Sequence, residues 1–186
     1  MELTSNLPGI VGLFAYSPHS AKPMKELAEE VLRNPGFSTI EPGERELIAS
    51  FVSLWNDCDF CHYSHRAVAT QLLGQKYVEK VIDKREIDRP LAQKLLVAAQ
   101  VTNSTIGNAW IKQVLIHIVE APPAEDEEMT ELEGRPKHDV ILIASMFNMY
   151  NRYVSHMGVA NPDLTWDDYM IMGQRIIELG YTNAQS

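Results

Sequence analysis

Four side chains that carry protons or electrons lie within eight residues of one another: Cys58, Cys61, His62 and His65. At about 100° per residue, all four fall on one face of a helix. Apolar residues continue this face toward residue 73, so helix packing is expected to shield the thiols partly from water. A pair of thiols beside imidazoles in such surroundings is a candidate for pKa tuning and redox chemistry.

A thiol must lose its proton before it attacks, and at an ordinary pKa near 8.5 only a small fraction is ionised at neutral pH. A helix N-terminus favours the thiolate, and His65 lies one turn after Cys61, where it can hold or accept the proton. Cys58 lies three residues before Cys61 and is placed to attack an oxidised Cys61 and close a disulfide. The spacing therefore favours a two-cysteine redox centre.

Three other interpretations fit the same residues. The first is a buried cysteine pair with histidines at the surface. The second is a zinc site made of both cysteines and His62 or His65, although zinc ligands usually come from separated segments and no second ligand pair follows. The third is c-type haem attachment, with His62 as the iron ligand, which normally requires export. Redox catalysis without a metal or cofactor is preferred.

Composition limits the class of protein. The 186 residues are 45% hydrophobic and 22% charged, which suits one globular domain. The net charge is −9, from 16 basic and 25 acidic residues, and a surface of that sign argues against nucleic acid as a partner. No apolar run approaches the ~18 residues of a membrane span. The opening Met1-Glu2 lacks a basic signal region, so we expect a cytoplasmic, reducing location.

Apolar periodicity predicts an all-α chain, because no alternating strand pattern persists. We expect an irregular lead-in over residues 1–21. The predicted helices run from Pro23 to before Asn34, from near Pro42 to 55, and over 58–73, 75–82, 89–103, 138–158 and 166–179, the last followed by Gly180. Helix and strand both stay open for 110–119, and a short helix is expected after Pro122-Pro123, within an acidic run.

A longer pattern links these features to a known family. The sequence has Glu46 and, after eleven further residues, the string Cys58-x-x-Cys61-x-x-x-His65. This pattern resembles the signature of alkylhydroperoxidase D-like proteins, within the carboxymuconolactone decarboxylase-like superfamily. Four further strings resemble its peroxidase-related branch: Glu44-Arg45-Glu46-Leu47-Ile48, Asn56-Asp57-Cys58, Leu7-Pro8-Gly9-Ile10 and Phe147-Asn148-x-Tyr150-Asn151-Arg152. The similarity covers most of the chain, with a redox core at about 41–74, whereas residues 102–137 match poorly.

This resemblance implies a single all-helical domain over 1–186, assembled as a homo-oligomer. It implies an oxidoreductase, a thiol-dependent peroxidase that reduces hydrogen peroxide or organic hydroperoxides. Cys61 is then the attacking, low-pKa thiol, Cys58 the resolving thiol, and Glu46 with His65 the proton relay. Electrons come from a thiol reductant, either a dithiol carrier or a thioredoxin-like protein. Some members carry a histidine between the cysteines, where this chain has Phe60.

Two other functions remain open. A non-enzymatic thiol/disulfide sensor keeps the redox pair without efficient turnover. Lactone decarboxylation is disfavoured, because the decarboxylase branch lacks the cysteine pair.

The helical wheel offers Glu44 as a rival to Glu46. Glu44 falls near the centre of an apolar stripe, where we expect a carboxylate to be buried and perturbed, whereas Glu46 lies on a side with small residues. The small side lets the cysteine helix approach, which selects Glu46 as the base. The apolar helix over 138–158 carries Met146, Phe147, Met149 and Tyr150 on more than one face, which supports the expected oligomer.

Overall fold

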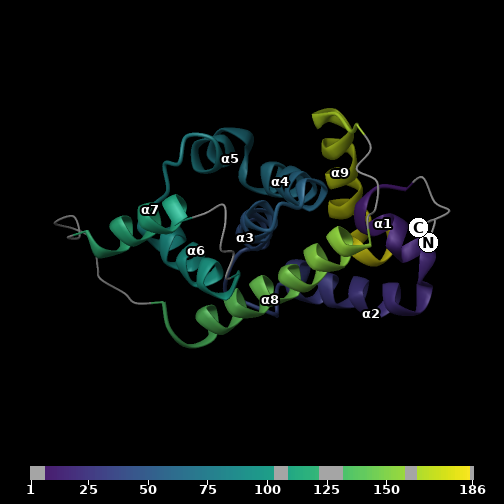
Figure 1. Cartoon of the computed structure of the whole chain (residues 1–186), viewed down its shortest axis with the longest axis horizontal. Helices are drawn as coiled ribbons and strands as arrows, with labels where there is room; N and C mark the ends of the chain where they lie inside the picture. Colours follow the sequence, from purple (N-terminus) through teal and green to yellow (C-terminus); the bar gives the residue numbers. More distant parts are fainter. Residues whose placement is uncertain (1–6, 103–108, 122–131, 158–162, 185–186) are drawn as a thin grey trace.

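The computed structural model describes residues 7–102, 109–121, 132–157 and 163–184, without the side chains of 109–112 and 114. Every regular element in these ranges is a helix, so the predicted all-α class is confirmed. The elements, shown in Figure 1, are α1 (Gly9–Tyr16), α2 (Pro18–Ala28), the π-helical turn η1 (Glu29–Arg33), α3 (Pro42–Trp55), α4 (Asp59–Leu73), α5 (Gln75–Ile82), α6 (Arg89–Thr102), α7 (Ala109–Glu120), α8 (Gly134–His156) and α9 (Trp166–Asn183).

Helix α3 is the centre of the fold, between α4, α6 and α8. Eleven of its fourteen residues are buried, so both its apolar and its small-residue sides are covered. Leu47, Ile48 and Phe51 enter the main hydrophobic core, where each large side chain contributes about 1.5–3 kcal/mol by burial. Ser50 and Ser53 on the other side allow α4 to pack closely, as the sequence predicts.

The turn between α3 and α4 sets the position of the first cysteine. Asp57 adopts φ +54, a left-handed conformation that aspartate tolerates better than most residues. The main-chain amide of Cys58 then donates to the Ser53 carbonyl at 3.0 Å. Helix α4 begins at Asp59, one residue after its predicted start, so Cys58 is its N-cap residue.

Helix α9 packs along α4 and ends in a kinked last turn. Gly180 has φ +80, and the helical hydrogen bonding resumes beyond it to Asn183. The regular helix therefore ends at residue 179, before Gly180, as predicted, whereas the short turn beyond Gly180 was not predicted. The last turn is held because the Tyr181 amide donates to the Glu29 carboxylate at 2.7 Å, and Arg33 donates to the Ile177 carbonyl at 2.9 Å.

The irregular lead-in predicted for residues 1–21 is wrong over the described residues of that range, because α1 and the first part of α2 occupy most of them. Pro18 takes the first position of α2, where its missing amide costs nothing. Pro23, the predicted start, lies inside the helix. Helix α1 is stabilised by burial of Leu13 and Phe14, so tertiary packing outweighs its glycines. These first helices and α9 lie at one end of the molecule, as Figure 1 shows.

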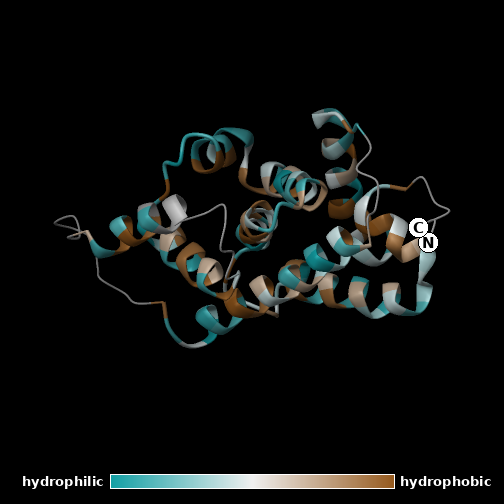
Figure 2. Cartoon of the chain, in the orientation of Figure 1, coloured by the Kyte–Doolittle hydropathy of each residue, from teal (hydrophilic) through white to brown (hydrophobic). Residues whose placement is uncertain are grey.

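Hydropathy follows the packing in Figure 2, where α5 is hydrophilic outside and hydrophobic toward the core, and hydrophobic turns of α6 and α8 meet. Helix α8 starts at residue 134, four residues before its predicted start. Of the four apolar residues named for the oligomer, Met146, Phe147 and Tyr150 are buried within this chain and Met149 is exposed, so these residues do not by themselves argue for an oligomer.

The segment left open between helix and strand is helical, as α7. The short helix expected after Pro122-Pro123, and most of the acidic run around it, fall outside the described residues. No helix in the described part of the chain has the length and apolar character that crossing a bilayer requires.

We predict that Gly180→Ala destabilises the fold more than Gly74→Ala. Both glycines have positive φ, which costs an L-residue about 1–3 kcal/mol. An added Cβ at Gly74 meets nothing within 4 Å, whereas one at Gly180 meets the side-chain ends of Arg33 and Glu29, which must move and lose their bonds to this turn. Chemical denaturation should show that the loss for Gly180→Ala exceeds the loss for Gly74→Ala by about 1–3 kcal/mol, the scale of the disturbed hydrogen bonds. Equal losses for the two variants would contradict this account of the last turn.

Candidate active site

The two cysteines are free thiols whose sulfur atoms lie 2.7 Å apart and share a hydrogen bond. Both side chains are buried, at 4% exposure each. The i, i+3 spacing at the start of α4 brings them together, as the sequence predicts. Such a pair needs only a small movement to reach the ~2.05 Å of a disulfide bond.

The pair does not ionise in the predicted order. The hydrogen bond between the thiols lowers the pKa of Cys58, with help from the main-chain amide of Cys61 and against the effect of burial. The same hydrogen bond, followed by burial, raises the pKa of Cys61 well above its ordinary value. In the resting reduced pair the first thiolate therefore forms on Cys58, whereas the lower pKa was predicted for Cys61.

Asn151 of α8 is a polar side chain that contacts both thiols and was not predicted as a site residue. It is 1% exposed, and its hydrogen bonds lower the pKa of each cysteine. The Asn151 amide donates to Ser53 Oγ at 3.1 Å and accepts from Asn56 at 3.0 Å, so its orientation is fixed. This network places a hydrogen-bond donor beside sulfur that otherwise has apolar surroundings.

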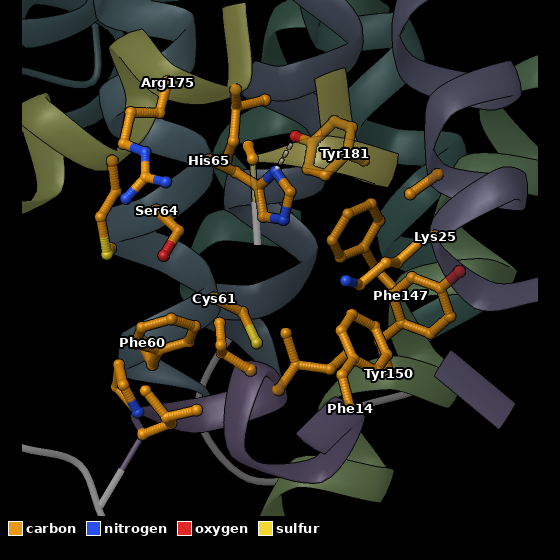
Figure 3. A pocket seen from close by; sticks show the side chains of 18 residues that line it. Phe14, Lys25, Phe60, Cys61, Ser64, His65, Phe147, Tyr150, Arg175 and Tyr181 are labelled. Atoms are coloured by element: carbon orange, nitrogen blue, oxygen red, sulfur yellow. Dashed lines mark hydrogen bonds between the residues drawn. The ribbon is translucent and has the colours of Figure 1, made fainter. Parts of the chain in front are cut away.

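Glu46 and His65 form a buried pair, with Glu46 Oε2 2.7 Å from His65 Nδ1. Tyr181 donates its hydroxyl to Glu46 Oε1 at 2.7 Å, and burial followed by the Glu46 charge raises the pKa of Tyr181 well above its ordinary value. With Nδ1 donating to the carboxylate, the free lone pair of His65 is on Nε2. Figure 3 shows that this second nitrogen faces the cavity.

The other two candidate side chains lie elsewhere. His62 is buried but turned to α3, where its Nδ1 lies 3.0 Å from Ser50 Oγ, and burial lowers the pKa of His62. The two imidazoles therefore do not share one site, although neither is at the surface. Glu44 is only half-buried and pairs with Lys94 at 2.8 Å, so its predicted burial in the apolar stripe is wrong.

An apolar cavity of about 310 Å³ opens beside the second cysteine. Cys61, His65 and Tyr181 are among the residues that line it, and Cys58 is not. Figure 3 shows the Cys61 sulfur directed into this space. Phe60 also lines the cavity, with its ring 6.1 Å from that of Tyr169, so the residue between the cysteines contributes an apolar wall.

Comparison with family models, with curated proteins and with solved structures gives no match to this chain. The family resemblance therefore stays a prediction from the sequence motif. Within the described residues, no three His, Cys, Asp or Glu side chains are grouped as a metal site.

The structure brings together the four predicted residues in two adjacent groups, Cys58 with Cys61 and Glu46 with His65. Sequence reasoning missed Tyr181 and Asn151. Tyr181 gives no sequence signal, because it lies 135 residues from Glu46 and was placed beyond the end of its helix. Asn151 belongs to the Phe147-Asn148-x-Tyr150-Asn151-Arg152 string that resembles the family, but only the packing of α8 against α3 shows what Asn151 contacts.

We predict that Asn151→Ala raises the pKa of Cys58, because the hydrogen bond from the Asn151 side chain favours the thiolate of Cys58. The measurement is the ultraviolet absorbance of the thiolate as a function of pH. Asn148→Ala is the matched control, since Asn148 bonds Asn56 and Thr102. An unchanged thiol titration in Asn151→Ala would remove this residue from the site.

Proposed function

We propose that the protein is a thiol-dependent peroxidase. The observation that carries the proposal is the position of Cys61, which touches the Cys58 sulfur at 2.7 Å on one side and lines an apolar cavity with His65 on the other. A peroxide in this cavity meets a sulfur nucleophile and a proton acceptor, and a second thiol lies directly behind that sulfur. Few other reactions need all three.

In the first step the Cys61 sulfur attacks the terminal oxygen of the peroxide. His65 Nε2 accepts the thiol proton as the S–O bond forms and the O–O bond breaks, and this proton then goes to the departing alkoxide. The products are an alcohol, or water from hydrogen peroxide, and a sulfenic acid on Cys61. Glu46 stabilises the protonated imidazole and holds its orientation, with its other oxygen fixed by Tyr181.

In the second step the Cys58 thiolate attacks the Cys61 sulfenic acid. An S–S bond forms, the S–O bond breaks, and hydroxide leaves as water after taking one proton. A resolving thiol must be ionised when the sulfenic acid appears. The hydrogen bond from the Cys61 thiol, the main cause of the lowered pKa of Cys58, is then gone, and the Cys61 main-chain amide and Asn151 remain to favour the Cys58 thiolate. An external dithiol then supplies two electrons and two protons, which restores both thiols.

The roles of the two cysteines rest on competing observations. Ionisation favours Cys58 as the attacking thiol, whereas access favours Cys61, since only Cys61 lines the cavity. We assign the attack to Cys61 because a nucleophile must first reach the peroxide. Its raised pKa then explains why a base beside it is required.

A redox sensor is the second candidate. Both sulfur atoms are buried, and only Cys61 is on the cavity wall. This burial slows a protein dithiol in reaching the oxidised pair, which favours a long-lived disulfide. A homo-oligomer also remains a proposal from the resemblance, as does the dithiol or thioredoxin-like donor.

We predict catalytic consumption of cumene hydroperoxide with dithiothreitol as reductant, and loss of this turnover in Cys61→Ser. After peroxide treatment, Cys58→Ser should retain a sulfenic acid on Cys61 that dimedone traps, whereas Cys61→Ser should give no adduct. The reverse labelling pattern assigns the attack to Cys58. Stoichiometric oxidation of the wild type without turnover would favour the sensor.

We predict that Glu46→Gln lowers kcat/KM by about 100-fold while circular dichroism shows an intact fold, because the imidazole loses its carboxylate partner. The pH dependence of kcat/KM should change with it, which a packing defect alone would not cause. The matched control is Glu44→Gln, which removes only the contact to Lys94 and should stay within about threefold of wild type. A larger effect at Glu44 would transfer the role to that residue.

A further inference from the structure

The cavity beside Cys61 differs in charge from the rest of the protein. The chain has a net charge of −9, yet the described residues that line the cavity include two cations, Lys25 and Arg175, and neither aspartate nor glutamate. Glu46 lies behind the wall and is bonded to His65. The remaining lining is mostly aliphatic and aromatic. An apolar space with positive charge at its wall suits a ligand that has an apolar body and an acidic group.

One polar side chain on this wall lacks a partner. Ser64 is more than nine-tenths buried, and its hydroxyl makes no hydrogen bond to the described residues. A buried hydroxyl in this state carries a desolvation cost that a ligand oxygen would remove. Figure 3 shows the Ser64 hydroxyl on the same side of the cavity as the guanidinium of Arg175. The hydroxyl and the guanidinium can both donate hydrogen bonds to the oxygens of an acidic group.

The two cations are not equivalent. The Lys25 ammonium stands 5.5 Å from the centre of the Phe14 ring, which already stabilises it. Arg175 is exposed, lines the cavity from α9, and forms no ion pair with an acid in the described part of the chain. A guanidinium also matches the two oxygens of a carboxylate better than an ammonium does.

We infer that the cavity binds hydroperoxides of apolar carboxylic acids, with the carboxylate on Arg175 and Ser64 and the chain against the apolar wall near Phe147. This inference rests on the proposed peroxidase function and names its substrate class. The reaction is the same attack by Cys61 on the terminal peroxide oxygen. The carboxylate is unchanged, and the product is the corresponding hydroxy acid.

Binding can be tested without any redox chemistry. Calorimetric titration of the reduced wild type, and of a variant with both Cys58→Ser and Cys61→Ser, would use decanoate, decanol and decyltrimethylammonium as probes. We expect decanoate to bind about tenfold more tightly than decanol, because only decanoate engages Arg175. The decyl cation should bind most weakly, since it meets charge of its own sign.

Three variants locate the head group. Arg175→Gln should weaken decanoate binding about tenfold and leave decanol unchanged. Arg152→Gln, at an exposed arginine of α8 that does not line the cavity, should change neither. Ser64→Ala should weaken decanoate binding, while the unfolding temperature of the free protein stays equal or rises because an unpaired buried hydroxyl is removed. A serine needed only for structure would lower that temperature.

Equal affinity for the three probes would overturn the inference, and so would an unchanged decanoate affinity in Arg175→Gln. A weaker decanoate affinity in Lys25→Gln, with an unchanged affinity in Arg175→Gln, would also overturn the assignment to Arg175. Since the titration requires no turnover, its failure would leave the peroxidase assay unaffected. A failed peroxidase assay would likewise leave the binding result standing.

Discussion

The buried carboxylate of Glu46 is the constraint on which the site depends. At 1% exposure, a charge of this kind is tolerated only when it is fully bonded. Its two oxygens are bonded by His65 of α4 and Tyr181 of α9, so these two helices must meet at one point of α3. The neighbouring Arg45 is also fully buried and donates to the carbonyls of Val31 and Asn34, which places a compensating positive charge beside Glu46.

This requirement explains the irregular parts of the fold. Tyr181 reaches Glu46 only because the chain turns at Gly180, and that turn is held by Glu29 and Arg33 of the π-helical segment. Earlier in α9, Gly173 allows close packing, because an added Cβ would lie 3.3 Å from the main chain of α4. The π-helical turn after α2 and the kink in α9 are therefore parts of one arrangement that fixes the hydrogen bonds of Glu46 with His65 and Tyr181.

The sequence predicts the parts of this site that are local. The i, i+3 spacing of the thiols and the proximity of Glu46 to the cysteine helix follow from helix geometry and from the small residues of α3. Tyr181 and Ser64 were not predicted, because their roles depend on which distant surfaces meet and on what remains unpaired there. The order of thiol ionisation also escaped prediction, since it depends on the 2.7 Å contact and on burial, which periodicity does not report.

The hydrogen bond between the two sulfur atoms gives the thiols different properties. It lowers the pKa of Cys58, with help from the Cys61 main-chain amide and Asn151. The same hydrogen bond, followed by burial, raises the pKa of Cys61, which faces an apolar space. In the proposed mechanism Cys61 therefore keeps its proton until His65 accepts it, and its reactivity depends on the Glu46–His65 pair and on what fills the cavity. The low polarity of the cavity disfavours a Cys61 thiolate in the resting protein. In the proposed reaction, the same low polarity strengthens the hydrogen bonds and charge interactions of that thiolate once a substrate has displaced water.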